Sequence, residues 1–365
     1  MAAAGGCAAV IAGALVVADV HNSGQRVTVS PGAHGPGPVP GTTFVANSTV
    51  GLPSGQPVGA GPGSITVYPP GATGNARPEA VITAGIDGPI ALAVDAAGNL
   101  WVANATSSTV VEYSRAELAT ASPAPTVTIS GPPQTILSQL SGLAFDAGGR
   151  LWLSSGRDLL EYSRSALAKS GAPHPEVAIG VSPVAGNGNG PGCIAFDWAG
   201  DLWFSTGVDM GELSKAQLAK SADSVQPELS VNSSNGLGSP CAPTFDRAGD
   251  IWLGDSQNNT VAEFLKTQVA GWRASGPPPV SLLDAPTGSC TTCDPRVVIS
   301  GAAISAPGGV TFDRSGNLWI PSAGKDTVVE LSQAEISKSG SPSPKSTIAG
   351  PTTRLDSPCA IAFEP

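Results

Sequence analysis

Hydrophobic residues occur along the chain in short runs of four or five, separated by segments rich in Gly, Pro, Asp and Ser. Runs of this length between turn-forming residues are typical of β-strands rather than helices. Five runs carry a tryptophan, and these follow one another at intervals of 51, 51, 49 and 67 residues. They are Trp101, Trp152, Trp203, Trp252 and Trp319. The pattern predicts an internal repeat of about fifty residues.

Each repeat contains four strand-like pieces. The first ends in Asp and is followed by Gly three residues later, as in residues 92–95 with Gly98, which predicts a hairpin turn. The second carries the Trp, and the third contains a recurring Glu, as in residues 110–113. The fourth follows a proline, as in residues 125–129, and proline suits the start of an outer edge strand because it lacks an N–H donor. Ser114-x-x-Glu117 predicts a capped helical turn between the third and fourth pieces.

Four antiparallel strands repeated every fifty residues or so are typical of the blades of a β-propeller. The C-terminal run 359–364 matches a first piece that has no successors, whereas the run 44–47 begins a repeat that lacks a first piece. We therefore predict an all-β, six-bladed propeller, closed by the C-terminal strand pairing into the N-terminal blade. Residues 15–29 resemble a degenerate second and third piece, which leaves seven blades as an alternative. The long interval before Trp319 predicts an insertion within 266–295.

Composition agrees with a turn-rich β protein. The 46 glycines and 34 prolines among 365 residues disfavour long helices, while 41% hydrophobic residues suffice for a core. The net charge of −10 and the absence of a basic cluster argue against binding to nucleic acid or to an anionic membrane surface. We expect a monomer with no nucleic-acid partner and no integral membrane domain.

The N-terminal residues 1–41 form an apolar leader or linker, and we assign residues 42–365 to a single propeller domain. The apolar stretch carries no charge before Asp19 and resembles the hydrophobic part of a signal peptide, without its positive start. A degenerate blade is the alternative for this segment. We expect the protein to be secreted or held in the cell envelope.

The unit Gly-Asn-Leu-Trp-Val-Ala-Asn at 98–104, followed by Thr-Val-Val-Glu-Tyr at 109–113, resembles the NHL repeat. Residues 64–68 with 70–75 resemble the variant common in bacterial envelope proteins. The resemblance extends over 42–365 and implies a six-bladed propeller. NHL-like propellers include protein- and RNA-binding modules as well as lyases and lactonases, so the resemblance leaves function open. Gluconolactonase-like relatives hold a divalent cation with carboxylates and amides near the channel, and virginiamycin-lyase-like relatives use a histidine and a glutamate.

The starts of the first strands predict which residues surround the central channel. The residues five places before the Asp of each repeat form one ring, and the residues four places before it form a second ring. Neither ring contains Asp, Glu, Asn or His. The first ring is Ile90, Ser141, Gly192, Cys241, Gly308 and Cys359, and the second is Ala91, Gly142, Cys193, Ala242, Gly309 and Ala360. The chain has three histidines, His21, His34 and His174, and we place the last on an outer connection. We therefore predict no catalytic residue, resident metal or cofactor.

The favoured function is a non-enzymatic binding or scaffold module that recognises a protein or small molecule on one face of the ring. A lactonase or lyase that uses a divalent cation in the channel is the alternative. Two groups of residues are candidate ligand contacts on the predicted recognition face. At the channel mouth these are Cys193, Cys241 and Cys359, and on the loops after the Trp strands they are Asn104, Asp158, Asp209, Asp255 and Asp326.

The cysteines allow several interpretations. Cys193, Cys241 and Cys359 are either small buried thiols, with or without a Cys193–Cys241 bridge between blades, or a soft-metal site. Cys290-Thr-Thr-Cys293 predicts a local disulfide, with a free thiol pair or a metal site as alternatives.

The recurring residues are predicted to be structural. The Trp side chains should pack between blades rather than stack on sugars, and the Asp residues should cap turns rather than bind calcium. The recurring Glu should make a structural hydrogen bond rather than act in acid–base catalysis.

Overall fold

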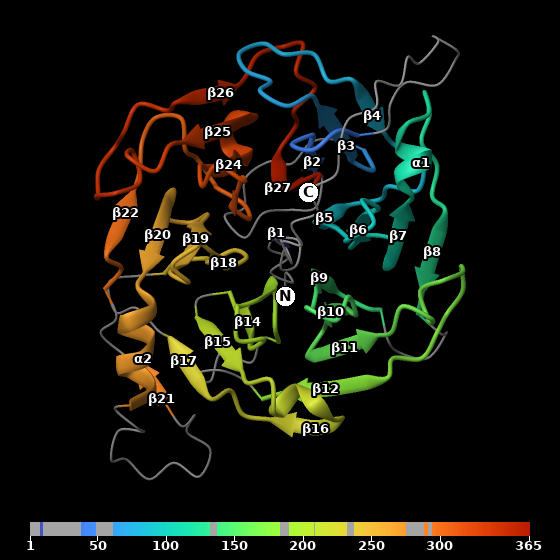
Figure 1. Ribbon diagram of the computed structural model, residues 1–365, viewed down its shortest axis with the longest axis vertical. Helices are drawn as coiled ribbons and strands as arrows, with labels where there is room; N and C mark the ends of the chain where they lie inside the picture. Colours follow the sequence, from blue (N-terminus) through green and yellow to red (C-terminus); the bar gives the residue numbers. More distant parts are fainter. Residues whose placement is uncertain are drawn as a thin grey trace, which may run out of the picture.

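The computed structural model describes residues 8–9, 38–48, 61–131, 137–182, 190–207, 209–231, 237–274, 288–290 and 294–365. Six antiparallel blades stand around a central axis (Figure 1). Blade 1 joins the two ends of the domain, because β27 (Pro358–Phe363) pairs with β2 (Thr43–Asn47), which continues into β3 (Ser64–Tyr68) and β4 (Ala80–Ile82). The predicted count of six blades and the predicted closure are both confirmed.

The other five blades follow in chain order. Blade 2 contains β5 (Pro89–Val94), β6 (Leu100–Asn104), β7 (Thr109–Tyr113) and β8 (Val127–Ser130). Blade 3 contains β9 (Leu140–Phe145), β10 (Leu151–Ser155), β11 (Asp158–Tyr162) and β12 (Val177–Val181). Blade 4 contains β13 (Ile194–Phe196), β14 (Leu202–Ser205), β15 (Met210–Leu213) and β17 (Leu229–Val231). Blade 5 contains β18 (Thr244–Phe245), β19 (Ile251–Asp255), β20 (Thr260–Phe264) and β22 (Val297–Ile299). Blade 6 contains β23 (Thr311–Phe312), β24 (Leu318–Ser322), β25 (Thr327–Leu331) and β26 (Ser346–Ile348).

Additional elements extend the blades. β16 (Ala222–Val225) pairs in parallel with β12, and β1 (Ala8–Ala9) pairs in parallel with β5 at the inner edge of blade 2. The insertion predicted within 266–295 contains α2 (Lys266–Ala274) and β21 (Gly288–Cys290), which adds to the outer edge of blade 4. The remaining helices are short: α1 (Arg115–Leu118), and 3-10 turns at Gln217–Ala219 and Ala323–Lys325. Within the described residues, no helix has the length and apolar character needed to span a membrane.

The hairpin turns follow from their sequence. Asp95 Oδ1 accepts hydrogen bonds from the backbone N–H groups of Ala97 and Asn99, and Gly98 has a φ of 83° that favours glycine. Asp95 Oδ2 also accepts from the Trp101 indole at 3.1 Å. The predicted role of these aspartates as turn caps is confirmed. Ser114 likewise accepts from Glu117 N, as the capping prediction requires.

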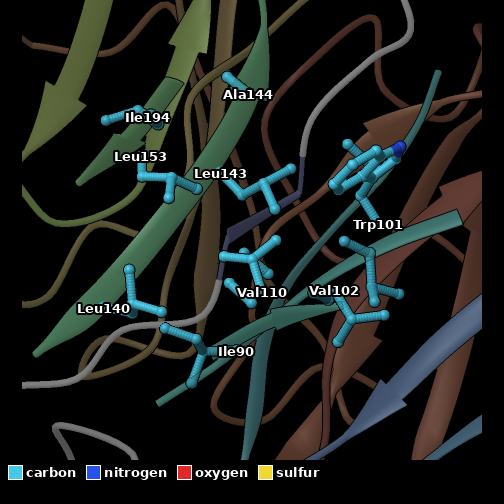
Figure 2. Close-up of a cluster of buried hydrophobic side chains, with 14 of the residues drawn as sticks. Ile90, Trp101, Val102, Val110, Leu140, Leu143, Ala144, Leu153 and Ile194 are labelled. Atoms are coloured by element: carbon cyan, nitrogen blue, oxygen red, sulfur yellow. The ribbon is translucent and has the colours of Figure 1, made fainter. Parts of the chain in front are cut away.

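The core lies between neighbouring blades. Each Trp meets, edge to face, the aromatic residue at the end of the next blade's first strand, with ring centroids 5.4 to 6.4 Å apart. The pairs are Trp101–Phe145, Trp152–Phe196, Trp203–Phe245, Trp252–Phe312 and Trp319–Phe363. Figure 2 shows aliphatic side chains of blades 2 and 3, such as Ile90, Val110 and Leu143, meeting beside Trp101. The predicted packing of the tryptophans between blades is confirmed.

Candidate ligand-binding site

The two ends of the central channel differ in chemistry. The first strand of each blade runs from one end to the other, since in blade 2 Pro89 pairs with Asn104 and Val94 with Leu100. We call the end where the first strands begin the start mouth, and the end that carries the Asp-capped hairpins the turn mouth. The sequence predicted recognition at the start mouth.

At the start mouth, neighbouring blades touch directly. Between blades 3 and 4 the Ser141 hydroxyl donates to Pro191 O at 3.1 Å. Between blades 6 and 1 the Gly309 N–H donates to Cys359 O at 2.9 Å. A Cβ atom on Gly254 of blade 5 would lie 2.4 Å from Gly308 O of blade 6, so only glycine fits at this seam. The small residues of this ring serve blade-to-blade contact.

The three cysteines predicted at this mouth are buried, and no S–S bond joins them in this structure. Cys193 Sγ and Cys241 Sγ lie 3.3 Å apart across the seam between blades 4 and 5. The Cys359 thiol instead donates to Pro89 O at 3.5 Å, between blades 1 and 2. Among the described residues, the clusters that bring three potential metal ligands within 4.8 Å of one another are carboxylate clusters and do not include the cysteines.

The rim residues predicted as ligand contacts fall into two groups. Asn104 and Asp255 are buried and hold loops, because Asn104 accepts from Asp87 N at 3.1 Å and Asp255 accepts from Gly238 N at 2.8 Å. Asp209 is also buried. Asp158 and Asp326 are exposed; partial burial raises the pKa of Asp158, and Asp326 accepts from Ser357 N at 2.7 Å.

Cys290 is the last residue of β21, while Cys293 lies outside the described residues, so the predicted local disulfide stays a prediction. His21, His34 and the run 15–29 also lie outside them.

The turn mouth contains a cavity of about 850 Å³ between the hairpins of several blades. Phe245, Phe312 and Phe363 form part of its apolar wall, together with Val94. Trp198, on the hairpin of blade 4, is 59% exposed at its edge and donates its indole N–H to Asp246 O at 3.2 Å. A pocket of this size accommodates a small molecule.

Two arginines lie at the same cavity. Arg247 and Arg314 occupy equivalent places in the hairpins of blades 5 and 6, and both are exposed. The Arg247 guanidinium donates to Arg314 O, which joins the two hairpins. Neither guanidinium forms an ion pair with a carboxylate of the described residues, although the charge of Arg314 acts to lower the pKa of Glu364.

A recurring sequence position marks this cavity. The residue after the hairpin Asp is Ala96 in blade 2 and Ala147 in blade 3, but Trp198, Arg247 and Arg314 in blades 4 to 6. This change from small to large side chains was a signal in the sequence, and reasoning that concentrated on the start of the first strands missed it.

The recurring Glu residues are structural, as predicted, but their partners are basic side chains. Glu263, at the cavity wall, binds Arg296 through contacts of 2.6 and 2.8 Å. Burial raises the pKa of Glu263, while Arg296 acts to lower it. Glu263 forms a three-carboxylate cluster with Asp246 and Asp250. Because the Arg296 guanidinium already occupies both carboxylate oxygens of Glu263, the cluster by itself does not indicate a metal site.

The same arrangement recurs in three other blades, in which the Glu–cation pairs are Glu161–Arg150, Glu212–Arg273 and Glu330–Lys345. Glu112 of blade 2 is the exception, with no ion pair among the described residues. Burial, and then the neighbouring Asp95, raises its pKa.

Glu364 occupies the hairpin Asp position in blade 1 and lines the cavity. Its side chain is fully buried and its carboxylate oxygens have no hydrogen-bond partner, although Arg115 Nη1 lies 3.3 Å from Oε1. Burial raises the pKa of Glu364. The turn mouth thus combines aromatic surface, two exposed arginines and the buried carboxyl group of Glu364 with further carboxylates of Asp246, Asp250, Glu263 and Asp313.

Comparison with known proteins supports the fold. No family model and no curated protein matches the chain. A structure of a nidogen–laminin complex is 14% identical, with a TM-score of 0.56 over 89% of this chain and 99% of that one. A Bacteroides caccae protein of unknown function is 11% identical, with a TM-score of 0.55 over 89% and 99%.

A putative 6-phosphogluconolactonase from Bacteroides uniformis is 12% identical, with a TM-score of 0.51 over 88% of this chain and 98% of that one. A Staphylococcus aureus virginiamycin B lyase aligns with a TM-score of 0.44, at 11% identity over 74% and 71%, and this carries no argument about the site. These likenesses show that the chain has the fold of a β-propeller. Their functions differ from one another, so the fold does not assign one here.

Proposed function

We propose that the protein is a non-enzymatic binding propeller that takes a small, ring-containing anion at the turn mouth. The observation that carries this proposal is the cavity of about 850 Å³, which has aromatic walls and two exposed arginines. It lies at the end of the channel opposite the one that the sequence favoured.

The ligand chemistry follows from the lining. Phe245, Phe312 and Phe363 offer apolar surface, and the exposed indole of Trp198 suits a flat ring. Arg247 and Arg314 suit a carboxylate, sulfonate or phosphate, because a guanidinium donates two parallel hydrogen bonds to such groups. An anion-binding site on a chain of net charge −10 depends on these local cations, since the overall field repels the ligand.

Fluorescence titration of the full chain with 8-anilino-1-naphthalenesulfonate, an aromatic sulfonate, tests the proposal. We expect saturable binding at one site, weakened at least tenfold by Trp198→Ala and by the double variant Arg247→Ala, Arg314→Ala. The matched control is the double variant Asp158→Asn, Asp326→Asn, which changes exposed charges near the start mouth and should leave binding unchanged. Binding that responds to the control and not to the turn-mouth variants would place recognition at the start mouth and refute the proposal.

The alternative function is a lactonase or lyase that holds a divalent cation in the channel. It is separated from the proposed function by elemental analysis of the purified chain together with the same titration. One stoichiometric divalent ion, with no probe binding at the turn mouth, would favour the enzyme.

A further inference from the structure

The seam between blades 4 and 5 is the place on the ring where two thiols face each other. Cys193 immediately precedes β13 and Cys241 lies shortly before β18, and their Sγ atoms are 3.3 Å apart. The two side chains are 0% and 4% exposed. The contacts described above at other seams of the start mouth involve backbone and hydroxyl groups, or one thiol and a carbonyl.

Backbone hydrogen bonds hold both cysteines in place. The Cys193 carbonyl accepts from Ser205 N at 3.0 Å, at the end of β14, and the Cys241 N–H donates to Gly254 O at 2.8 Å, within β19. The backbone of each cysteine is therefore hydrogen-bonded to the second strand of its own blade. Their proximity is a property of how the two blades pack rather than of a loop.

We propose that Cys193 and Cys241 are a cross-linking site, at which a disulfide staples blade 4 to blade 5 at the start mouth. An S–S bond measures roughly 2.05 Å, so the sulfur atoms need to approach by only about 1 Å. The bond would close a loop that contains all four strands of blade 4. This inference is independent of the ligand proposed at the turn mouth.

The surroundings of the two sulfurs differ once the seam is closed. Burial works against a thiolate at Cys193, but hydrogen bonds from the Cys241 thiol, the Ala242 N–H and the Ser205 hydroxyl together lower the pKa of Cys193. Burial, and then the neighbouring Cys193, raises the pKa of Cys241. These shifts describe the reduced pair in the closed ring.

The oxidant is a small disulfide of the glutathione class. The thiolate of one cysteine of the pair attacks it, forms a mixed disulfide and releases one small thiolate, which takes up a proton. The thiol of the other cysteine then loses its proton and attacks the protein sulfur of the mixed disulfide, which releases the second small thiol and forms the Cys193–Cys241 bond. Two protein thiols are oxidised and one small disulfide is reduced to two thiols.

Burial determines when this exchange takes place. A small disulfide does not reach the Cys193 sulfur in the closed ring, so the bond forms during folding, before the seam closes. Once buried, it is protected from reductants. Such a staple suits an oxidising compartment, which agrees with the export that we propose for this chain.

Cys359 provides an internal control. It belongs to a different seam, where its thiol donates to Pro89 O; its charge acts on Cys241, but among the described residues no hydrogen bond joins its sulfur to another sulfur. The proposal therefore requires Cys359 to remain reduced under conditions in which the pair is oxidised.

The test is refolding of the full chain in a mixture of reduced and oxidised glutathione, followed by quenching with N-ethylmaleimide, trypsin digestion and mass mapping. Cleavage after Lys215 and Lys220 separates the two cysteines, so their peptides stay joined only through a disulfide. We expect the Cys193 and Cys241 peptides to be linked and Cys359 to be alkylated. The melting temperature of the oxidised chain should exceed that of the reduced chain by about 5 °C.

The variants give the converse result. In Cys193→Ser or Cys241→Ser the difference in melting temperature between oxidised and reduced protein should vanish, whereas Cys359→Ser should keep it. If the single variants do not fold, the double variant Cys193→Ala, Cys241→Ala and the peptide map of the unmodified chain still test whether the disulfide forms. Alkylation of both Cys193 and Cys241 after oxidative refolding, or a link from either of them to another cysteine, would overturn the proposal.

Discussion

The start mouth and the turn mouth of the channel differ in how closely neighbouring blades pack. At the start mouth, small residues bring the backbones of neighbouring blades into contact, as at Gly254 and Gly308. At the turn mouth, large aromatic and charged side chains keep the blades' hairpins around a cavity of about 850 Å³. Close contact between the backbones leaves little space for a ligand. Positions at which the residue type varies between blades therefore mark a candidate binding site only where the backbones stay apart.

Added volume at the start mouth should cost the most. A Cβ atom on Gly308 would lie 2.0 Å from Cys359 O, so Gly308→Ala must push blades 6 and 1 apart. We expect a loss of about 3 kcal/mol in the free energy of unfolding, measured by urea denaturation. The matched control is Gly271→Ala on α2, where the new Cβ meets nothing within 4 Å and helix propensity favours alanine. Equal stability of Gly308→Ala and wild type would show that the start mouth is not closely packed.

Loss of a cation at the turn mouth should have the next largest effect. Arg296→Met leaves the buried Glu263 carboxylate without its partner. We expect destabilisation by about 2 kcal/mol, less than for a fully buried pair because Arg296 is partly exposed to solvent. Thermal unfolding of Arg296→Met against Arg296→Lys measures this, since lysine keeps the charge. If the two variants lose the same stability, the packing of the arginine rather than its charge is what matters.

In blade 2, removal of a charge should raise stability instead, because Glu112 has a raised pKa and forms no ion pair among the described residues. A carboxyl group whose folded-state pKa lies above its usual 4.5 stabilises the protein below that value, and this contribution is lost as pH rises through the folded-state pKa. Glu112→Gln should therefore raise stability at pH 7 by on the order of 0.5 kcal/mol, by relieving the desolvation of a buried charge.

Urea unfolding of wild type and Glu112→Gln from pH 7 to pH 4.5 measures this effect. Acidification should stabilise the variant less than wild type, because the variant lacks the Glu112 carboxyl group. The remaining stabilisation should come from Glu263 and Glu364, whose pKa values are also raised by burial. A variant less stable than wild type at pH 7 would mean that Glu112 has a partner that stabilises its charge.

The smallest effect on stability is expected at Trp198. Its side chain is 59% exposed, so Trp198→Ala should change the free energy of unfolding by less than about 0.5 kcal/mol. The same variant should nevertheless weaken binding of the aromatic sulfonate. A large loss of stability would show that Trp198 holds the hairpins of blades 4 and 5 together. The double variant Arg247→Ala, Arg314→Ala would then have to provide the evidence for binding at the turn mouth.

The repeat itself was readable from the chain because it depends on contacts close in sequence. Asp95 caps a turn that ends within four residues, and Ser114 caps the helix that follows it directly. The tryptophan at a fixed place in each repeat packs against an aromatic residue at a fixed place in the next repeat, as Trp101 packs against Phe145. Local geometry and regular spacing together determined six blades and the strand that closes the ring.

Only the tertiary structure decided how residues without a fixed spacing meet. The cation beside each recurring Glu comes from a different part of its surroundings: Arg150 lies 11 residues before Glu161, whereas Arg273 lies 61 residues after Glu212. The distance between the Cys193 and Cys241 sulfurs depends on how two blades pack, and the cavity depends on how hairpins from several blades diverge. Sequence periodicity specifies what each blade repeats, but contacts between non-equivalent positions exist only once the ring is closed.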